Sequence, residues 1–405
     1  MAEAAVPVSR VQVGTLGVTQ TLAWASSYYL PAVLGPAIAR DLGLDLPTVF
    51  AAFSLALVVS ALVGPYAGRL IDQRGGRGVL MASNVVFALG LLTLSQAATG
   101  WHLFAAWILL GLGMGVGLYE AAFATLVRLQ GQGARRSITS ITLIAGFAST
   151  VGWPLSAWLD AQWGWREASL TWMALHLLVG LPLNALLPRA GAAPTVEPAP
   201  DQEVATQVPA TSGPKQQGLM VLLAGVFAVT AFISTAMAAH LPGVIAAAGA
   251  SPAMAIAAAA LLGPAQVIAR VFEWAVLQRW HPVVAARWAM ACHPLGVVAM
   301  LLFAGPWSLV FVVLHGAGNG IMTIAKGALP LALFGSQGYG ARQGVLMVPA
   351  RIAQAAAPWL FGWLLSYWGS NVMWVSSALA TAGALSLLLI RPAGQQRSSA
   401  QTETG

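Results

Sequence analysis

The sequence predicts an all-α membrane protein with about twelve transmembrane helices, arranged as two pseudo-symmetric six-helix bundles. Three observations predict this fold: an apolar composition, twelve apolar runs of spanning length, and a repeat that relates the two halves. Hydrophobic residues make up 58% of the 405 residues and charged residues only 8%, against roughly 25% charged in an ordinary soluble domain. The chain lacks the polar residues that would cover a soluble fold, whereas lipid can be the solvent of its outer surface.

The composition also argues against several classes of function. The net charge of +7 would suit nucleic acid, but the basic residues lie between apolar runs and form no dense patch, so we expect no such partner. The single cysteine, Cys292, rules out a disulfide framework or a multi-thiol metal cage within the chain. Because no catalytic cluster is visible, we expect no enzyme activity, no cofactor and no bound metal.

Each apolar run is long enough for one span, since about 20 mainly apolar residues cross a bilayer. The first bundle, predicted over residues 1–188, contains the runs 12–36, 47–70, 79–97, 102–127, 138–159 and 167–188. The second bundle, predicted over residues 218–391, contains the runs 218–241, 252–277, 284–303, 307–330, 343–366 and 372–390. The polar stretch 189–217 is predicted to be a flexible cytoplasmic linker, and residues 392–405 a disordered cytoplasmic tail.

The distribution of Lys and Arg predicts the orientation of the chain. With the N-terminus inside, 14 of the 19 basic residues lie on the inner side, while Arg40 and Arg166 lie outside and three lie within spans. The inner residues are Arg10, Arg69, Arg74, Arg77, Arg128, Arg135, Arg136, Arg189, Lys215, Arg279, Arg287, Arg342, Arg391 and Arg397. We therefore expect a multi-pass protein of the cell inner membrane with both termini in the cytoplasm.

An internal repeat relates the two predicted bundles. A shift of 205 residues places seven residues of the first half on identical residues of the second. They are Gly111, Gly113, Gly115, Trp158, Leu159, Trp163 and Gly164, which fall on Gly316, Gly318, Gly320, Trp363, Leu364, Trp368 and Gly369. Two six-span halves of the same orientation are the parallel repeat found in one major class of transporters.

The loop after the second run reads Gly68-Arg69-Leu70-Ile71-Asp72-Gln73-Arg74-Gly75-Gly76-Arg77. It resembles the signature of the major facilitator superfamily between its second and third helices, and it falls in the corresponding loop of a two-times-six chain. The resemblance covers nearly the whole chain apart from the linker and the tails, and it implies a transporter fold. The equivalent loop of the second half departs from the pattern, because Gln278 stands where the aspartate is expected.

By this resemblance, Gly68, Asp72, Arg74, Gly75 and Arg77 form a gating loop that latches the two halves on the cytoplasmic side. An aspartate at a helix end can pair with neighbouring arginines and with the positive N-terminus of another helix. The alternative is that the arginines only fix the topology.

A charge inside a span costs at least roughly 2.5–3.5 kcal/mol by insertion scales, so such residues usually face a cavity. Glu120 lies in the fourth run, about eight residues before Arg128, on a small-residue face with Gly113 and Gly117. Because burial and a nearby cation both affect its protonation, we take Glu120 as the candidate for proton coupling. A structural ion pair with a cation nearer the cytoplasm is the alternative.

The tenth run carries His315, Asn319, Thr323 and Lys326, whose spacing of four, four and three residues puts them on one helix face. A polar stripe in a span faces water or protein rather than lipid. In the family that the chain resembles, the first, fourth, seventh and tenth helices line the central cavity. The resemblance therefore implies that His315, Asn319 and Lys326 contact the substrate, with helix packing as the alternative.

Two arginines within spans suit an anionic substrate, because a guanidinium group offers carboxylates a forked donor. Arg270 lies in the eighth run with Gln266 and Glu273 on its face, and Arg351 lies in the eleventh run. An arginine in the eighth helix with a cation in the eleventh resembles the family members that carry oxalate and monocarboxylates. Neutralisation of Arg270 by Glu273 is the alternative.

The first run adds Gln20, Trp24 and Tyr28 as candidate substrate contacts. The adjacent segment 26–31 is loosely similar to bacterial arsenite-efflux proteins of the same superfamily. The excess of bases over acids within spans instead favours a small organic or inorganic anion.

We thus predict a secondary transporter that works by alternating access and is coupled to a proton or solute gradient. Its expected partners are a small-molecule substrate and the lipid bilayer, and we expect a monomer. One alternative is efflux of a toxic compound such as arsenite or a drug. A non-transporting membrane sensor on a transporter scaffold is the alternative from another class.

Overall fold

The computed structural model describes residues 10–189, 214–303 and 307–390, and these residues form helices and no strands. The all-α prediction is therefore confirmed. Eight stretches of the described chain are long and apolar enough to cross a bilayer, and some of them join several helices. Most of the predicted linker and the whole predicted tail lie outside the described residues. Helix α11 begins at Pro214, inside the range predicted as linker.

The helices follow the predicted apolar runs, although several runs are broken into shorter helices. The N-terminal half contains α1 (Arg10–Ser26), α2 (Leu30–Leu42), α3 (Leu46–Arg74), α4 (Gly76–Ser95), α5 (Gly100–Gly117), α6 (Tyr119–Gln130), α7 (Ala134–Ala145), α8 (Ala148–Trp163), α9 (Trp165–Leu175), a π turn (His176–Gly180) and α10 (Leu181–Ala185). The C-terminal half contains α11 (Pro214–Ala247), α12 (Pro252–Ala260), α13 (Leu262–Ala275), a 3-10 turn η3 (Leu277–Arg279), α14 (Pro282–Phe303), α15 (Trp307–Phe334), α16 (Tyr339–Trp368) and α17 (Val372–Leu388). The number of twelve crossings stays a prediction.

The local sequence explains where several helices begin. The carboxylate of Asp45 accepts a hydrogen bond from the Thr48 amide at 3.1 Å, and a proline follows two residues later. Thr99 and Ser251 cap α5 and α12 in the same way. Such caps satisfy amide groups that the first helical turn leaves unpaired.

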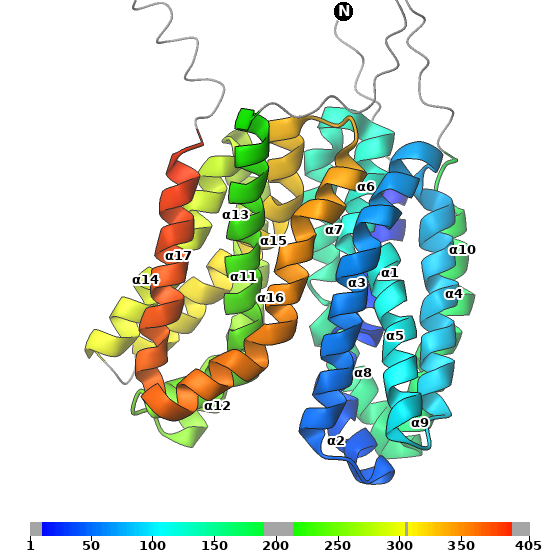
Figure 1. The fold of residues 1–405 in the computed structure, drawn as a ribbon, viewed down its shortest axis with the longest axis horizontal. Coiled ribbons are helices and arrows are strands. Elements are labelled where there is room, and N and C mark those ends of the chain that lie inside the picture. The colour runs from blue at the N-terminus through cyan, green and yellow to red at the C-terminus, as the bar shows by residue number, and fades with distance from the viewer. Residues whose placement is uncertain (1–9, 190–213, 304–306, 391–405) are drawn as a thin grey trace, which may run out of the picture.

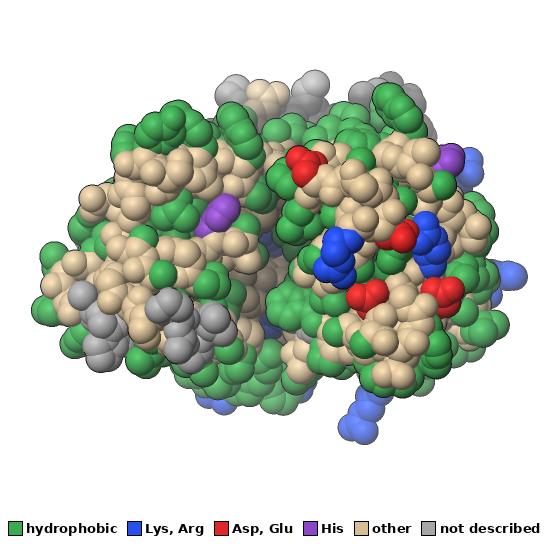
Figure 2. Space-filling view, turned by 90° about the horizontal axis from the view of Figure 1, so that it is seen from below, with side chains coloured by type: hydrophobic (Ala, Val, Ile, Leu, Met, Phe, Trp, Pro, Cys, Tyr) green, Lys and Arg blue, Asp and Glu red, His purple; other side chains and the backbone are tan. Residues whose placement is uncertain are grey.

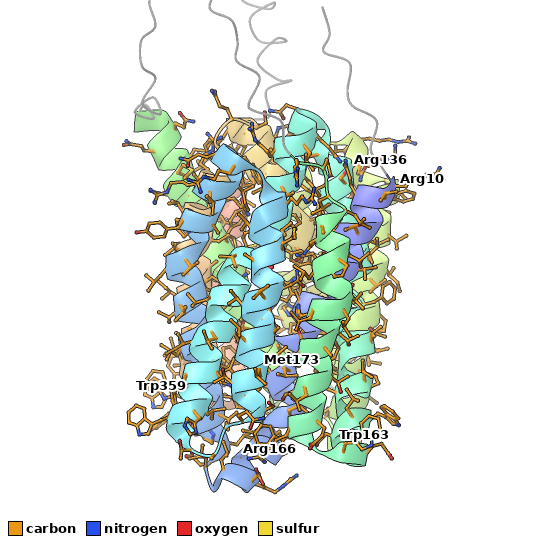
Figure 3. All side chains as sticks on the ribbon, turned by 90° about the vertical axis from the view of Figure 1, so that its right-hand side faces the viewer. Arg10, Arg136, Trp163, Arg166, Met173 and Trp359 are labelled. Carbon is orange, nitrogen blue, oxygen red and sulfur yellow. The ribbon has the colours of Figure 1, made fainter. Side chains whose placement is uncertain are left out.

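The two halves stand side by side, and the described chain enters and leaves the bundle at one end (Figure 1). Arg10 and Arg136 lie at that end, which we call the basic end, whereas Trp163 and Arg166 lie at the opposite end, which we call the far end (Figure 3). Each half has a buried core of aliphatic and aromatic side chains, and a third buried cluster includes residues of both halves. Many large apolar side chains, including Tyr66, Leu178 and Trp359, remain exposed, as lipid-facing side chains must be.

The halves meet along α3 and α16, which pack closely near the basic end. A side chain at Gly68 would run into the carbonyl group of Gly340. One turn further along α16, a Cβ atom on Gly344 would lie 2.6 Å from Cα of Pro65. The contact therefore depends on residues that lack a side chain. On the far end the two lobes are separated by a hollow (Figure 2).

Candidate functional site in the central cavity

Three helical spans of the N-terminal half are interrupted beside the centre of the molecule. The breaks fall between α1 and α2, between α5 and α6 at Leu118, and between α7 and α8. Residues next to all three breaks, among them Tyr29, Glu120 and Gly146, line one cavity. A broken helix inside a membrane protein exposes backbone groups, and these are tolerated where they face protein or a cavity.

The cavity has a volume of about 110 Å³ and lies between the two halves. Its lining residues are Trp24, Tyr28, Tyr29, Tyr119, Glu120, Phe123, Ala145 and Gly146 of the N-terminal half, and Ser234, Gln266, Arg270, Asn319, Thr323, Lys326, Gln343, Met347, Arg351 and Gln354 of the C-terminal half. The N-terminal half thus contributes the aromatic rings and the only acid of the lining, whereas the C-terminal half contributes all three bases and the amides. The cavity is large enough for a small solute, since roughly 10–15 Å³ of cavity volume is enough for a single water molecule.

Glu120 and Arg351 form an ion pair that joins the two halves across the cavity. Nη2 of Arg351 lies 3.0 Å from both carboxylate oxygens of Glu120, and Nη1 donates to Gln354 at 3.1 Å. The side chains are 5% and 17% exposed for Arg351 and Glu120. The partner of Glu120 is therefore Arg351 rather than a cation nearer the basic end. Glu120 thus engages Nη2 and Gln354 engages Nη1, so both terminal nitrogens of the guanidinium group have partners.

Helix α6 begins one residue before Glu120, because Leu118 is extended, with φ −82° and ψ −168°. This start places the carboxylate in the first turn of a helix, where the macrodipole favours negative charge. The break also releases the carbonyl of Gly117, which accepts a hydrogen bond from Gln20 Nε2 at 2.7 Å. Gln20 was predicted to contact substrate, but it does not line the cavity. It holds the backbone at the break instead.

Aromatic rings form the N-terminal wall of the cavity. The ring of Trp24 lies 5.1 Å from that of Tyr28 and 4.9 Å from that of Tyr119, between centroids. The Arg351 guanidinium lies 6.0 Å from the Trp24 ring, within the range of a cation–π contact. The predicted contacts Trp24 and Tyr28 therefore do line the cavity, whereas Tyr119 was missed. Tyr119 could have been identified from its position directly before Glu120, a charged residue within a predicted span.

The polar stripe of α15 divides between two spaces. Asn319, Thr323 and Lys326 line the central cavity, and no hydrogen bond or ion pair engages the Lys326 ammonium among the described residues. His315, one turn before Asn319, lines a smaller pocket inside the C-terminal half instead. The direct substrate contact predicted for His315 therefore lacks support from its position.

Arg270 faces the central cavity and is not neutralised by Glu273. It donates to the Thr142 carbonyl at 3.3 Å and to Gln266 at 3.4 Å, while its buried Nε has no partner among the described residues. Glu273 lies 3.5 Å from Arg135 of the N-terminal half. The buried indole nitrogen of Trp24 also lacks a partner in the described chain.

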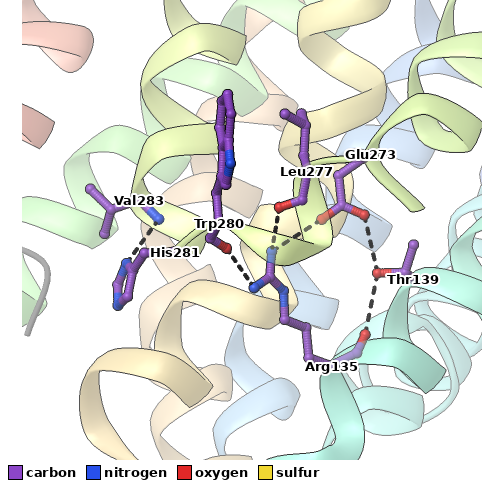
Figure 4. A network of polar contacts seen from close by, with 7 residues as sticks. All are labelled: Arg135, Thr139, Glu273, Leu277, Trp280, His281 and Val283. Carbon is purple, nitrogen blue, oxygen red and sulfur yellow. Dashed lines mark hydrogen bonds and ion pairs between the residues drawn. The ribbon is translucent and has the colours of Figure 1, made fainter. Parts of the chain in front are cut away.

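Arg135 is the centre of a contact between the halves near the basic end (Figure 4). It donates to the carbonyl groups of Trp280 and Leu277 at 2.8 and 3.4 Å, and Thr139 donates to Glu273 at 3.3 Å. Arg135 was not among the candidate site residues predicted from the sequence. The internal repeat could have identified Arg135, because a shift of 205 residues places it on Gly340, the contact residue at the start of α16.

The other contact near the basic end uses the predicted gating loop. The two carboxylate oxygens of Asp72 accept hydrogen bonds from the amides of Gly340 and Ala341, each at 2.8 Å. These amides belong to the first turn of α16, so the carboxylate lies at a helix N-terminus. Arg74 and Arg77 form no ion pair with Asp72 among the described residues. Gly75 joins α3 to α4 with φ +82°, which is costly for residues with a side chain.

Comparison with known proteins provides independent information. The family model of the Major Facilitator Superfamily matches residues 16–325. A protein of Thermoproteus tenax described as an uncharacterized 38 kDa protein in the 23S RNA operon is 27% identical over 370 residues, covering 88% of this chain and 89% of that protein. The multidrug resistance protein MdtL of Salmonella dublin is 28% identical over 151 residues, covering 36% of this chain and 37% of MdtL.

A solved structure shares the whole architecture. The crystal structure of the human organic anion transporter MFSD10 matches with a TM-score of 0.74 at 15% identity, over 94% of this chain and 100% of that one. At this level of identity the match shows the fold alone.

Proposed function

The chain belongs to the major facilitator superfamily, and from this premise we propose that it is a secondary active transporter that moves a small organic or inorganic anion through the central cavity by alternating access. Transporter function is general to the family, whereas the anion and its coupling are our inference. The cavity supplies the reason for an anion, and the Glu120–Arg351 pair supplies a means of coupling.

The observation that carries the proposal is the charge of the cavity. Its lining includes Arg270, Lys326 and Arg351 but only one acid, Glu120. Three positive groups against one negative group leave a formal excess of two positive charges. Fixed cations in a site with low-dielectric walls attract anions strongly. The Lys326 ammonium, which has no hydrogen-bond or ion-pair partner among the described residues, would receive the anion.

Glu120 would couple anion binding to a proton. In the structure both carboxylate oxygens of Glu120 accept hydrogen bonds from Nη2 of Arg351. A proton on Glu120 removes the negative charge and releases the guanidinium, which then binds the substrate anion in its place. Substrate and proton would therefore bind together and cross together, so the mechanism is symport. Loss of the proton would restore the Glu120–Arg351 pair and displace the anion.

The two contacts near the basic end would act as gates. Both join the halves there, while a hollow separates the lobes at the far end (Figure 2). They also occupy equivalent positions, because a shift of 205 residues places Gly68 on Glu273 and Arg135 on Gly340. Alternating access would require both contacts to break as the basic end opens.

We further propose that the basic end faces the cytoplasm of a cell with an inner membrane, and that the protein acts as a monomer. The excess of Arg and Lys on that side supports this orientation. Reporter fusions at residues 132 and 164 would test it: the reporter at residue 132 should report the cytoplasm. Cytoplasmic activity of the fusion at residue 164 would contradict the orientation.

The direct test is binding and flux of small carboxylates by the purified protein. A ligand that binds the folded state raises the melting temperature in proportion to its occupancy. We expect Arg351→Gln to weaken the binding of the active carboxylate by more than tenfold. Arg166→Gln, which alters an arginine at the far end outside the cavity lining, should leave it unchanged. Equal effects of the two substitutions would contradict the anion site.

Drug efflux is the second candidate, favoured by the partial likeness to MdtL and by the aromatic wall of the cavity. Adding amphipathic drugs and arsenite to the same binding assay separates the two functions. Stabilisation by cationic or neutral drugs that survives Arg351→Gln would favour efflux. Binding without flux in proteoliposomes would instead favour the sensor alternative.

A further inference from the structure

Two histidines inside the C-terminal half contact each other away from the central ion pair. Nδ1 of His293 on α14 lies 3.0 Å from Nδ1 of His315 on α15. On its other side, His293 Nε2 lies 3.0 Å from the hydroxyl of Ser376 on α17. Both residues are buried, with 5% and 4% of their surface exposed.

The hydrogen bonds that connect Ser376, His293 and His315 leave one ring nitrogen without a partner among the described residues. The Ser376 hydroxyl donates to the Met373 carbonyl at 3.0 Å, so it accepts from Nε2–H of His293. Neutral His293 then has a bare Nδ1, which accepts from Nδ1–H of His315. Because a neutral imidazole carries one N–H, Nε2 of His315 is left as a bare acceptor. No described residue hydrogen-bonds this nitrogen.

His293 and His315 line a pocket of about 30 Å³, which is enough for a water molecule. Thr230, Ser234 and Asn319 give it polar walls. Ser234 and Asn319 also line the central cavity, so the two spaces adjoin. A proton that reaches the central cavity therefore has a polar route to the pocket.

The surroundings favour one added proton rather than two. The two imidazoles are the only titratable groups in the lining of this pocket, which receives residues from α11, α14, α15 and α17. Cys292 directly precedes His293 on α14 and lies outside the lining of this pocket. Arg270, Lys326 and Glu120 belong to the lining of the central cavity. Two cations in contact would repel strongly without a nearby acid. One added charge avoids this repulsion, and it would lie against the Phe311 ring, which stacks on His315 at 5.7 Å between centroids.

We propose that His293 and His315 form a second proton-binding site, which holds one extra proton between the two rings and is reached from the central cavity through the pocket beside Ser234 and Asn319. The proton leaves a hydronium ion for Nε2 of His315, and water remains. His315 Nδ1–H can then pass to His293 Nδ1, which moves the charge to His293 while His315 becomes neutral again. In both forms every N–H of the pair facing Ser376 or the other ring keeps its partner.

The test is nitrogen-15 NMR of the full-length protein in lipid nanodiscs, with all six histidines labelled and the pair assigned by His293→Gln and His315→Gln. We expect a coupling between the two Nδ1 atoms across their hydrogen bond. As the pH falls, the signals of both rings should change together with one midpoint. His176, which contacts Ser26 and Asn84 in the other half, is the internal control and should not follow them.

Two variants separate this site from Glu120 and from simple packing. Ser376→Ala removes the acceptor of His293 Nε2–H and should move the midpoint to more acid pH by about one unit, as expected for a lost hydrogen bond to a charged group. Glu120→Gln should leave a common midpoint in place whether or not the anion proposal holds. Separate midpoints for the two rings, or two neutral rings down to the pH at which the wild-type protein unfolds, would overturn the proposal.

Discussion

One nitrogen of Arg351, Nη2, lies 3.0 Å from both carboxylate oxygens of Glu120, and the two residues belong to opposite halves of the molecule. The ion pair thus connects the bundles through the cavity itself. Breaking such a pair by removing one charge leaves the other uncompensated. The protonation of Glu120 therefore bears on both the charge of the cavity and the contact between the halves.

The first prediction concerns this carboxylate. Glu120→Gln should abolish accumulation driven by a pH gradient, lowering it by more than tenfold, because the amide cannot change charge. Exchange of labelled for unlabelled substrate should persist, since it needs no net proton movement. Both rates are measured in proteoliposomes. Glu167→Gln, an exposed acid on α9, is the matched control, and full proton-driven accumulation by Glu120→Gln would refute the coupling role.

The second prediction concerns Asp72 at the start of α16. Asp72→Asn removes a charge that two backbone amides bind, so it should destabilise the state closed at the basic end by about 1–2 kcal/mol. That corresponds to a roughly 5–30-fold shift towards the open state. Spin labels at positions 132 and 279, in a Cys292→Ser background, should report a longer distance. An unchanged distance distribution would exclude a latch at Asp72.

The third prediction concerns the contact of Arg135 with Glu273. Arg135→Gln and Glu273→Gln should each favour opening at the basic end, and the double variant should add little to either one. The expected coupling energy is on the order of 1 kcal/mol, obtained from the same distance measurement on all four proteins. Combining Arg135→Gln with Asp72→Asn should instead be additive, because the two contacts share no residue. Additive single effects at Arg135 and Glu273 would mean that this ion pair is inert.

The fourth prediction concerns the glycine contact between α3 and α16. Gly68→Ala places a methyl group against the Gly340 carbonyl, so the closed arrangement should be lost and transport should fall by at least tenfold. Gly78→Ala on α4 is the matched control, because a Cβ atom there meets nothing within 4 Å. Transport by Gly68→Ala at the rate of the control would show that the helices can separate without loss of function.

The fifth prediction concerns pH at the far end. The hydrogen bond from Arg166 holds the pKa of Asp41 below its ordinary value. A lowered pKa means that the stabilising contribution is present above the unfolded pKa of about 4 and is lost as the pH falls through the folded pKa. The melting temperature of Asp41→Asn should therefore lie below that of the wild type at pH 6 and approach it under acid conditions. In an Arg166→Gln background, Asp41→Asn should have no pH-dependent effect.

Much of the helical architecture could be predicted from the sequence, because apolar runs of spanning length mark the helices directly. The breaks within the runs could not. The 102–127 run is apolar through Leu118, and only the packing of α5 and α6 around the cavity shows that the helix stops there. The free carbonyl group at this break, that of Gly117, accepts a hydrogen bond from the distant side chain of Gln20. Such a contact produces no pattern in the local sequence.

The charged residues of the candidate site could be predicted from the sequence, but the pairs that they form could not. Glu120, Arg270, Lys326 and Arg351 stand out because charges are rare in spans, and all four line one cavity. Their pairing was less accessible. Helical spacing suggested Glu273 as the neutralising partner of Arg270, but Glu273 contacts Arg135 on another helix. Contacts between the halves depend on residues more than 100 positions apart, which periodicity within one helix cannot reveal.

The interrupted helices described above also affect how the molecule can seal its contents. On the far-end side of the breaks, α2 packs against α8, and on the basic-end side α6 packs against α7. If the breaks served as hinges, α2 and α8 would move over the hollow while α6 and α7 stayed in place. A solute could then be enclosed from both compartments before any contact at the basic end is broken. Such an occluded intermediate would keep the membrane tight to protons during each transport cycle.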